Sequence, residues 1–343
     1  MHTPILPSLE ITNFRIFRHL RIEHLGQVNL VVGKNNVGKT ALLEALWLYA
    51  RRGVPAVIRD QVARRDEAVA SDYGSITALR HIFTNRPDQW QQRLSLTIGP
   101  IDTPEQRLDI TIEPPTDSSS SALPRYVIRH GGTPRLNVDL LASIFDIDGL
   151  PTLRNIEATI LTADGRMNPA YPESLWEKIA LTDDEERVIA WLQLIAPEIE
   201  RISLKSDGNG RGYRVPMARI RGGHEPVALR SFGDGLVRLF ALAVTAFSAR
   251  NGLLLIDEIE NGLHYSIQPA LWRRIFELAA TLNIQVFATT HSWDCIEAFQ
   301  IAAAEHQADG RMIKLGRSGG EIVATSFSEH DMAIITHEQI EVR

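Results

Sequence analysis

The sequence has 343 residues, of which 44% are hydrophobic and 23% charged, and its formal net charge is −6 at pH 7. This composition is typical of a globular protein with one large domain or two smaller ones, and the negative charge does not favour a nucleic-acid-binding surface. No stretch approaches the roughly 18 apolar residues of a membrane helix, and the N-terminus lacks the features of a secretory signal. The single cysteine, Cys295, fits a reducing compartment, so we expect a cytoplasmic protein with no membrane partner.

The first predicted elements are two short antiparallel strands. Leu9 to Phe17 alternates between apolar and polar residues sufficiently to form a strand. Leu20 to Leu25 is expected to be its hairpin partner, with Arg18 and His19 in the turn.

A glycine-rich loop follows, between a predicted strand and a predicted helix. Residues 33–40, GKNNVGKT, fit the pattern G-x-x-x-x-G-K-[ST] of the phosphate-binding P-loop. The apolar run from Val28 to Val32 before it indicates a buried strand. From Ala41 onward the large apolar residues share one face, which predicts a helix beginning near Lys39.

Each residue type in this loop has a chemical reason. Gly33 and Gly38 allow a tight, partly left-handed backbone that points N–H groups at phosphate oxygens. Lys39 supplies a positive charge to the β- and γ-phosphates, and Thr40 offers a hydroxyl to Mg²⁺. The N-terminus of the following helix attracts the same phosphates. The sequence therefore predicts a site for ATP and Mg²⁺.

The middle of the chain has weaker signals. Residues 54–92 are expected to be helical, and arginines at 51, 52, 59, 64, 65, 80 and 86 indicate either a DNA- or partner-facing surface or an ordinary solvated face. Leu94 to Ile98 and Leu108 to Ile112 predict a two-stranded antiparallel piece. Further signals predict a loop at 114–124, a strand at Tyr126 and Ile128, a helix from a Thr182–Glu185 capping box through Leu192, and a turn at 208–212.

From Ser231 onward, predicted helices and strands alternate. We expect helices at 235–249, at 271–282 and from His291 to Phe299, and strands at 252–256 and 284–288. This alternation predicts parallel strands joined by right-handed crossovers, and hence an α/β fold.

Two adjacent carboxylates end one of these strands. Asp257 and Glu258 follow the apolar run LLLI, at the edge where ligands of open α/β sheets bind. Asp257 is suited to hold Mg²⁺, which takes few carboxylates and keeps several waters. Glu258 is suited to orient and deprotonate an attacking water, which is worth on the order of 10²–10⁴ in rate. A strand followed by a solvated acidic turn is the structural alternative.

A second anion site is predicted just before the helix at 235–249. Ser231, Gly233, Asp234 and Gly235 stand at its start, where backbone N–H groups and the helix dipole favour an anion. A plain helix cap with flexible glycines is the alternative. His291, in TTHS at the end of a later strand, can hydrogen-bond a γ-phosphate.

The order of these motifs, together with ITNFRIF near the N-terminus, resembles the ABC-type ATPase heads of the RecF, SMC and OLD (overcoming lysogenization defect) branch. The resemblance is strong over about 1–52 and 228–300. It implies a P-loop NTPase with a mixed central sheet, an N-terminal antiparallel β piece and a helical insertion. One bilobed domain is expected, with lobes at 1–150 and 151–343 and a variable insertion from about residue 53.

The resemblance also implies residue roles. Glu258 would be the catalytic base, His291 the switch histidine, Asp257 the Walker B aspartate, and Glu260 to His264 the D-loop. Mg²⁺ would be held by Thr40 and Asp257. Nucleotide binding would fall to Asn13, Arg15, Gly33, Lys34, Asn35, Asn36, Val37, Gly38, Lys39, Thr40, Ala41 and, as the signature loop reaching a second subunit, Ser231, Gly233, Asp234 and Gly235.

Departures from the family pattern argue against a transporter ATPase, an SMC protein and an OLD nuclease. The signature reads SFGDG instead of the transporter type S-G-G-Q, no Q-loop glutamine is identified, and no coiled-coil arms interrupt the chain. Only 52 residues follow His291, too few for the nuclease domain of OLD nucleases. The pattern is that of a stand-alone head that forms ATP-sandwiched homodimers or larger homo-oligomers.

The sequence favours two functions over a transporter ATPase and over a non-enzymatic nucleotide sensor, against which the intact Glu258 argues. The first is an ATP-driven switch that controls a separately encoded effector, such as a nuclease or toxin, in phage defence. The second is a RecF-like DNA-binding ATPase of repair, which the arginines of 51–93 favour and the acidic pI of 6.0 disfavours.

Overall fold

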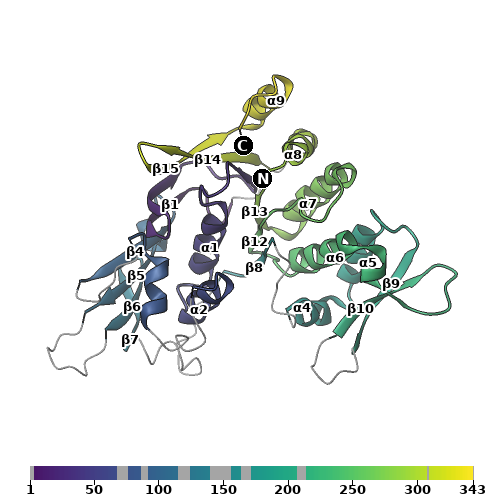
Figure 1. Cartoon of the computed structure of the whole chain (residues 1–343), viewed down its shortest axis with the longest axis horizontal. Helices are drawn as coiled ribbons and strands as arrows, with labels where there is room; N and C mark the ends of the chain where they lie inside the picture. Colours follow the sequence, from purple (N-terminus) through teal and green to yellow (C-terminus); the bar gives the residue numbers. More distant parts are fainter. Residues whose placement is uncertain are drawn as a thin grey trace.

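The computed structural model describes residues 4–67, 76–85, 92–114, 124–139, 156–163, 171–206, 214–306 and 309–342. Within these ranges, two six-stranded sheets and one three-stranded sheet are connected and covered by helices (Figure 1). The N-terminal antiparallel sheet lies on one side of helix α1 (Lys39–Ala50), and most other helices lie on the opposite side of the molecule. No described helix is long and apolar enough to cross a membrane.

The central sheet carries the P-loop strand β3 (Val28–Val32) in its middle. Its order is β15 (Glu321–Phe327), β14 (Gly310–Ser318), β3, β13 (Gln285–Thr289), β12 (Leu253–Ile256) and β8 (Ala158–Leu161). Only β15 is antiparallel to its neighbour. This confirms the mixed central sheet and the parallel pairing of the strands before Asp257 and His291.

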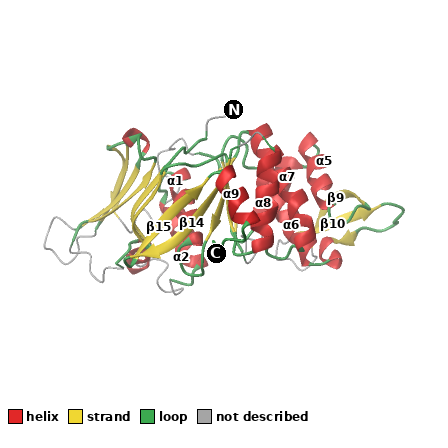
Figure 2. Cartoon of the chain, turned by 90° about the horizontal axis from the view of Figure 1, so that it is seen from above, coloured by secondary structure: helices red, strands yellow, loops and turns green. Residues whose placement is uncertain are grey.

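Both faces of this sheet are buried, which explains why its strands are apolar throughout. Leu253 and Leu255 point into the core shared with α1, whereas Leu254 and Ile256 point into the core on the other face. That second face is covered by α6 (Asp234–Phe247), α7 (Gln268–Leu282) and α8 (Trp293–Glu305), as Figure 2 shows. The remaining helices on this side are α4 (Tyr171–Ile179), α5 (Asp183–Leu192) and α9 (Glu329–His337).

The antiparallel sheet is wider than the sequence predicted. Its order is β2 (Phe17–Ile22), β1 (Leu9–Phe14), β4 (Leu94–Gly99), β5 (Leu108–Glu113), β6 (Arg125–His130) and β7 (Thr133–Asp139). The expected pair β4–β5 and the strand at Tyr126 are therefore parts of one sheet instead of separate pieces. A third sheet of β11 (Val227–Ala228), β10 (Arg214–Ile220) and β9 (Ile199–Ser206) extends the helical side.

The predicted turn of the N-terminal hairpin is wrong. Arg18 and His19 lie inside β2, and the chain reverses at Arg15 and Ile16. Asn13 and Arg15 adopt left-handed backbone conformations, with φ of 57° and 50°. The pattern concealed this turn because Phe14 and Phe17 on either side of it are both buried and pair across the hairpin.

The arginine-rich segment is less helical than expected. It contains α2 (Pro55–Arg64) and a 3₁₀ turn over Ile76–Ile82, while residues 68–75 and 86–91 lie outside the described ranges. Thr182 caps α5 through its hydroxyl, which accepts from the Asp184 N–H, and the Glu185 carboxylate accepts from the Leu181 N–H. Most of the predicted loop at 114–124 and the predicted turn at 208–212 lie outside the described residues.

Candidate nucleotide site

A cavity of about 550 Å³ lies at the carboxyl end of β3, where the predicted P-loop turns into α1. Its walls come from the N-terminal hairpin, the P-loop, the end of α2 and the end of β12. It is lined by Arg15, Ile16, Asn35, Asn36, Gly38, Lys39, Thr40, Ala41, Arg65, His81, Thr84, Asp257 and Glu258.

The two glycines of the loop occupy places where a side chain would not fit. Gly33 has φ of 144°, and a Cβ on it would lie 2.4 Å from the carbonyl oxygen of Leu315. Gly38 has φ of 98° and is packed against Ile16 and Phe17 of the hairpin. The helix α1 then begins at Lys39, as predicted.

Lys39 is folded back over the loop. Its Nζ donates to the carbonyl oxygens of Gly33, at 2.7 Å, and Lys34, at 3.2 Å. Burial lowers the pKa of Lys39, and the negative charges of Asp257, Glu258 and Glu260 oppose that shift. The ammonium group is thus held by the loop, in the wall of the cavity that Asp257 and Glu258 also line.

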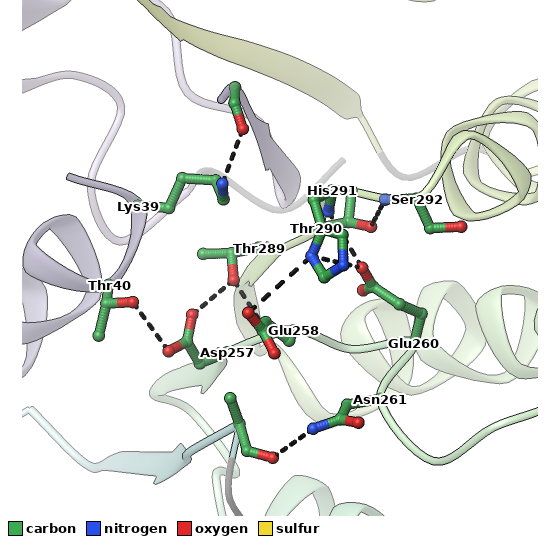
Figure 3. Close-up of polar contacts among 12 residues, drawn as sticks. Lys39, Thr40, Asp257, Glu258, Glu260, Asn261, Thr289, Thr290, His291 and Ser292 are labelled. Atoms are coloured by element: carbon green, nitrogen blue, oxygen red, sulfur yellow. Dashed lines mark hydrogen bonds and ion pairs between the residues drawn. The ribbon is translucent and has the colours of Figure 1, made fainter. Parts of the chain in front are cut away.

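Asp257 joins the two predicted halves of the site (Figure 3). Its Oδ2 accepts a hydrogen bond from the Thr40 hydroxyl at 2.9 Å, and its Oδ1 accepts one from the Thr289 hydroxyl at 2.6 Å. No cluster of three or more potential metal-binding His, Cys, Asp or Glu side chains occurs among the described residues. One hydroxyl and one carboxylate at a cavity wall nevertheless fit Mg²⁺, which retains most of its waters.

Glu258 and His291 lie beside this pair. Glu258 has a left-handed backbone with φ of 47°, and its N–H donates to the Thr289 hydroxyl at 2.9 Å. Its Oε1 is 3.9 Å from His291 Nδ1, while Oε1 of Glu260 is 3.3 Å from the same nitrogen. Glu260 also accepts from the backbone N–H of His291, which fixes the turn after β13. A half-exposed carboxylate at the cavity wall is able to accept a proton from a water.

The predicted signature residues do not line this cavity. Ser231, Gly233 and Asp234 are exposed at the start of α6. Gly233 has φ of 100° with open space where a Cβ would stand, whereas a Cβ on Gly235 would lie 2.6 Å from the carbonyl oxygen of Gly262. Ser231, Gly233 and Asp234 therefore face outward from the chain that carries them, whereas Gly235 packs against Gly262. The role of all four residues stays a prediction.

The two predicted N-terminal residues differ in position. Arg15 lines the cavity and is buried, and its Nε lies 2.7 Å from a carboxylate oxygen of Glu44. The side chain of Asn13 instead donates to the carbonyl oxygen of Ser95 and is not part of the cavity wall.

Several residues of the site were not predicted. Arg238, buried on α6, donates to the carbonyl oxygens of Thr162, Asp257 and Glu258 and so ties the signature helix to the end of β12. Thr289 directly follows the predicted strand at 284–288 and ends β13 in the structure, but nothing local showed that its hydroxyl reaches Asp257. The variable segment also contributes residues to the cavity wall, and no motif in the sequence pointed to them. These residues are Arg65, His81 and Thr84.

The fold and the site together define the class: this is an ABC-type ATPase head of the RecF and SMC kind. Residues 28–294 match the family model described as "AAA domain, putative AbiEii toxin, Type IV TA system". The chain belongs to this family.

A curated relative and a solved structure agree with this class. A Helicobacter pylori protein named "ATP/GTP phosphatase" is 27% identical over 331 residues, covering 85% of this chain and 87% of its own. An SMC head crystallised with the C-terminal winged-helix domain of ScpA superposes with a TM-score of 0.58 at 16% identity, over 95% of this chain and 98% of its own, which shows the shared fold.

RecF proteins match over shorter stretches. The RecF of Clostridioides difficile is 46% identical over 45 residues, which cover 13% of this chain and 12% of that protein.

Proposed function

We propose that this chain binds ATP with Mg²⁺ at the P-loop cavity, hydrolyses it to ADP and phosphate, and uses that cycle as a dimeric switch for a separately encoded effector. The observation that carries the proposal is the contact between Thr40 and Asp257, with Glu258 beside it, on one cavity wall with Lys39. The name of the Helicobacter relative supports hydrolysis and extends the candidate substrates to GTP.

The residues divide the chemistry among them. The P-loop N–H groups and Lys39 bind the phosphates. Mg²⁺ held by Thr40 and Asp257 would neutralise charge on the β- and γ-phosphate oxygens. Glu258 accepts a proton as a water oxygen bonds to the γ-phosphorus and the bond to the ADP oxygen breaks. His291 hydrogen-bonds the γ-phosphate, with Glu260 holding its ring and backbone.

Dimerisation is supported by where the signature residues lie. Ser231 and Gly233 are exposed and absent from the cavity of their own chain, so a second chain is needed if they are to contact nucleotide. The family description supports a role with an effector or toxin, and defence against phage is the function we favour.

Replacing Glu258 with glutamine tests this proposal. The amide keeps the shape of the side chain but cannot take the proton, so Glu258→Gln should bind ATP, lose turnover and accumulate as a dimer in light scattering. The same protein carrying Gly233→Trp should remain monomeric, because the ring blocks backbone approach to the γ-phosphate. Wild-type turnover in Glu258→Gln would overturn the general-base role. If the molecular mass of Glu258→Gln is the same with and without ATP, the dimeric switch is wrong, unless the chain is a constitutive oligomer. For a constitutive oligomer, ATP should instead slow hydrogen exchange at 231–235.

A RecF-like DNA-binding ATPase is the second candidate, favoured by the short RecF matches around the motifs. Binding of the purified chain to duplex DNA that weakens steeply with salt would support it. A defined protein that co-purifies with the chain from its own host, and whose activity changes with ATP, would support the effector switch.

A further inference from the structure

One buried carboxylate holds two arginines beside the nucleotide cavity. Glu44, on α1, is 6% exposed. Its Oε2 lies 2.7 Å from Nε of Arg15, and its Oε1 accepts from Nε of Arg65 at 2.7 Å. Arg15 comes from the hairpin turn and Arg65 from the end of α2, so Glu44 joins two segments that are far apart in sequence.

The surrounding structure fixes this arrangement. The buried Gln61 side chain donates to the backbone carbonyl oxygen of Glu44 at 2.8 Å, which anchors α2 against α1 one turn before Arg65. Burial raises the pKa of Glu44, and the two guanidinium groups oppose that shift. A buried charge of this kind is costly unless paired, and both of its oxygens are paired here.

The two arginines still have donors that no described residue accepts. Arg15 Nη2 is buried and makes no hydrogen bond to another described residue, although Nη1 bonds to Glu67. Arg65 uses Nε for Glu44, and its terminal nitrogens make no hydrogen bond within the described part of the chain. Both side chains line the cavity. Guanidinium groups with unused donors at a cavity wall are suited to phosphate oxygens.

The position of Arg65 selects which phosphates it reaches. It lines the same cavity as Asp257, whose carboxylate bonds to Thr40. In a P-loop, the hydroxyl at the position of Thr40 marks the metal between the terminal phosphates. Arg65 therefore lines one cavity with the residues, Thr40 and Lys39, that would meet the β- and γ-phosphates.

We propose that Arg65 is a further nucleotide-binding residue that contacts the terminal phosphates, and that Glu44 is the positioning residue that orients it together with Arg15. This inference rests on the proposed nucleotide site. It adds a second cation from the variable segment to the one supplied by Lys39, and it assigns a role to one of the arginines whose purpose the sequence left open.

Calorimetric titration of the full chain with ATP, ADP and AMP, each with Mg²⁺, tests the role of Arg65. Arg65→Ala should weaken ATP binding by about tenfold, the usual cost of a lost charged hydrogen bond, and should leave AMP affinity nearly unchanged. Arg65→Lys should restore part of the loss. Arg64→Ala is the matched control, because Arg64 is adjacent, pairs with Asp60 at 3.1 Å and does not line the cavity.

A double-mutant cycle tests the role of Glu44. Glu44→Gln should weaken ATP binding several-fold, and this loss should shrink when Arg65 is already alanine, because the carboxylate acts through the arginine. A purely structural role would give the same loss in both backgrounds. If Glu44→Gln does not fold, Glu44→Asp in the same cycle should show the same coupling, since its shorter side chain draws the arginine back.

The outcomes separate this inference from the proposed function. If Arg65→Ala binds ATP as the wild type does while Lys39→Ala does not, the inference is wrong and the nucleotide site stands. If Arg65→Ala weakens the binding of AMP as much as the binding of ATP, Arg65 does not contact the terminal phosphates. If the wild type itself binds none of the three nucleotides, the proposed function fails first, and this inference fails with it.

Discussion

Lys39 carries the most direct prediction at the scale of the single residue. Lys39→Ala removes the lysine that is held by the loop carbonyls at the cavity wall. We expect ATP binding to fall below detection in titration calorimetry. Lys205→Ala is the matched control, because Lys205 is an exposed lysine on β9 and does not line the cavity. Unchanged ATP affinity in Lys39→Ala would contradict the P-loop assignment.

At the same scale, the contacts around Asp257 were only partly predictable. Its position at the end of an apolar strand was visible in the sequence, as was the hydroxyl of Thr40. The hydroxyl of Thr289, which bonds to both Asp257 and the Glu258 backbone, was not, because a threonine at the end of a strand has no local mark of the neighbour it will face.

At the scale of elements, Arg238 connects helix α6 to strand β12. Arg238→Met keeps the aliphatic volume but removes the donors to the carbonyl oxygens after β12 and β8. Hydrogen bonds to charged groups are worth about 1.5–3 kcal/mol each, so we expect a loss of at least about 2 kcal/mol in the free energy of unfolding by urea denaturation. Turnover should fall as well, because the Glu258 backbone loses its anchor.

Arg274→Met on the exposed side of α7 is the control for Arg238, since a surface pair such as Arg274–Glu277 contributes little. A loss of stability in Arg238→Met no larger than in this control would contradict the anchoring role.

A second prediction at this scale concerns the contact between β6 and the end of α1. Burial and the positive charge of Arg52 lower the pKa of His130 to about 4, and Arg52 is hydrogen-bonded to the ring at Nε2. The unfolded chain therefore binds a proton that the folded chain does not between about pH 6.5 and pH 4. Stability should fall as the pH drops through this window.

Urea unfolding of the wild type and of His130→Gln across that window measures the effect. The glutamine variant should have a shallower loss of stability between pH 6.5 and pH 4, while above pH 7 the difference between the two proteins should no longer change with pH. Parallel pH profiles would contradict the assignment.

At the scale of the whole molecule, the cavity joins segments from distant parts of the chain. The hairpin supplies Arg15, α2 supplies Arg65 and β12 supplies Asp257. A ligand that binds only the folded state stabilises it by about 2.7 kcal/mol at one hundred times its dissociation constant. ATP with Mg²⁺ should therefore raise the melting temperature of Glu258→Gln by several degrees. An equal rise in the same protein with Lys39→Ala would show binding elsewhere.

The sequence by itself determined the elements that depend on local pattern. Residues close together in the chain encode the P-loop with its strand and helix. They also encode the apolar strands predicted at 252–256 and 284–288, which form β12 and β13 within one residue of those bounds, and the helices after them. Buried parallel strands are apolar on both faces, and glycines mark backbone conformations that other residues rarely adopt. These patterns can therefore be recognised without knowing which elements pack against them.

Only the tertiary structure decided which distant side chains meet. Packing between distant segments decided the hairpin turn at Arg15 and the single sheet that unites β1 with β7. It also decided the pairing of Glu44 with Arg65, 21 residues away, and with Arg15, 29 residues away. A buried charge is stable only where partners from other elements surround it, and the chain contains many arginines that look alike in sequence. Which of them turns toward the cavity is settled when α2 packs against α1.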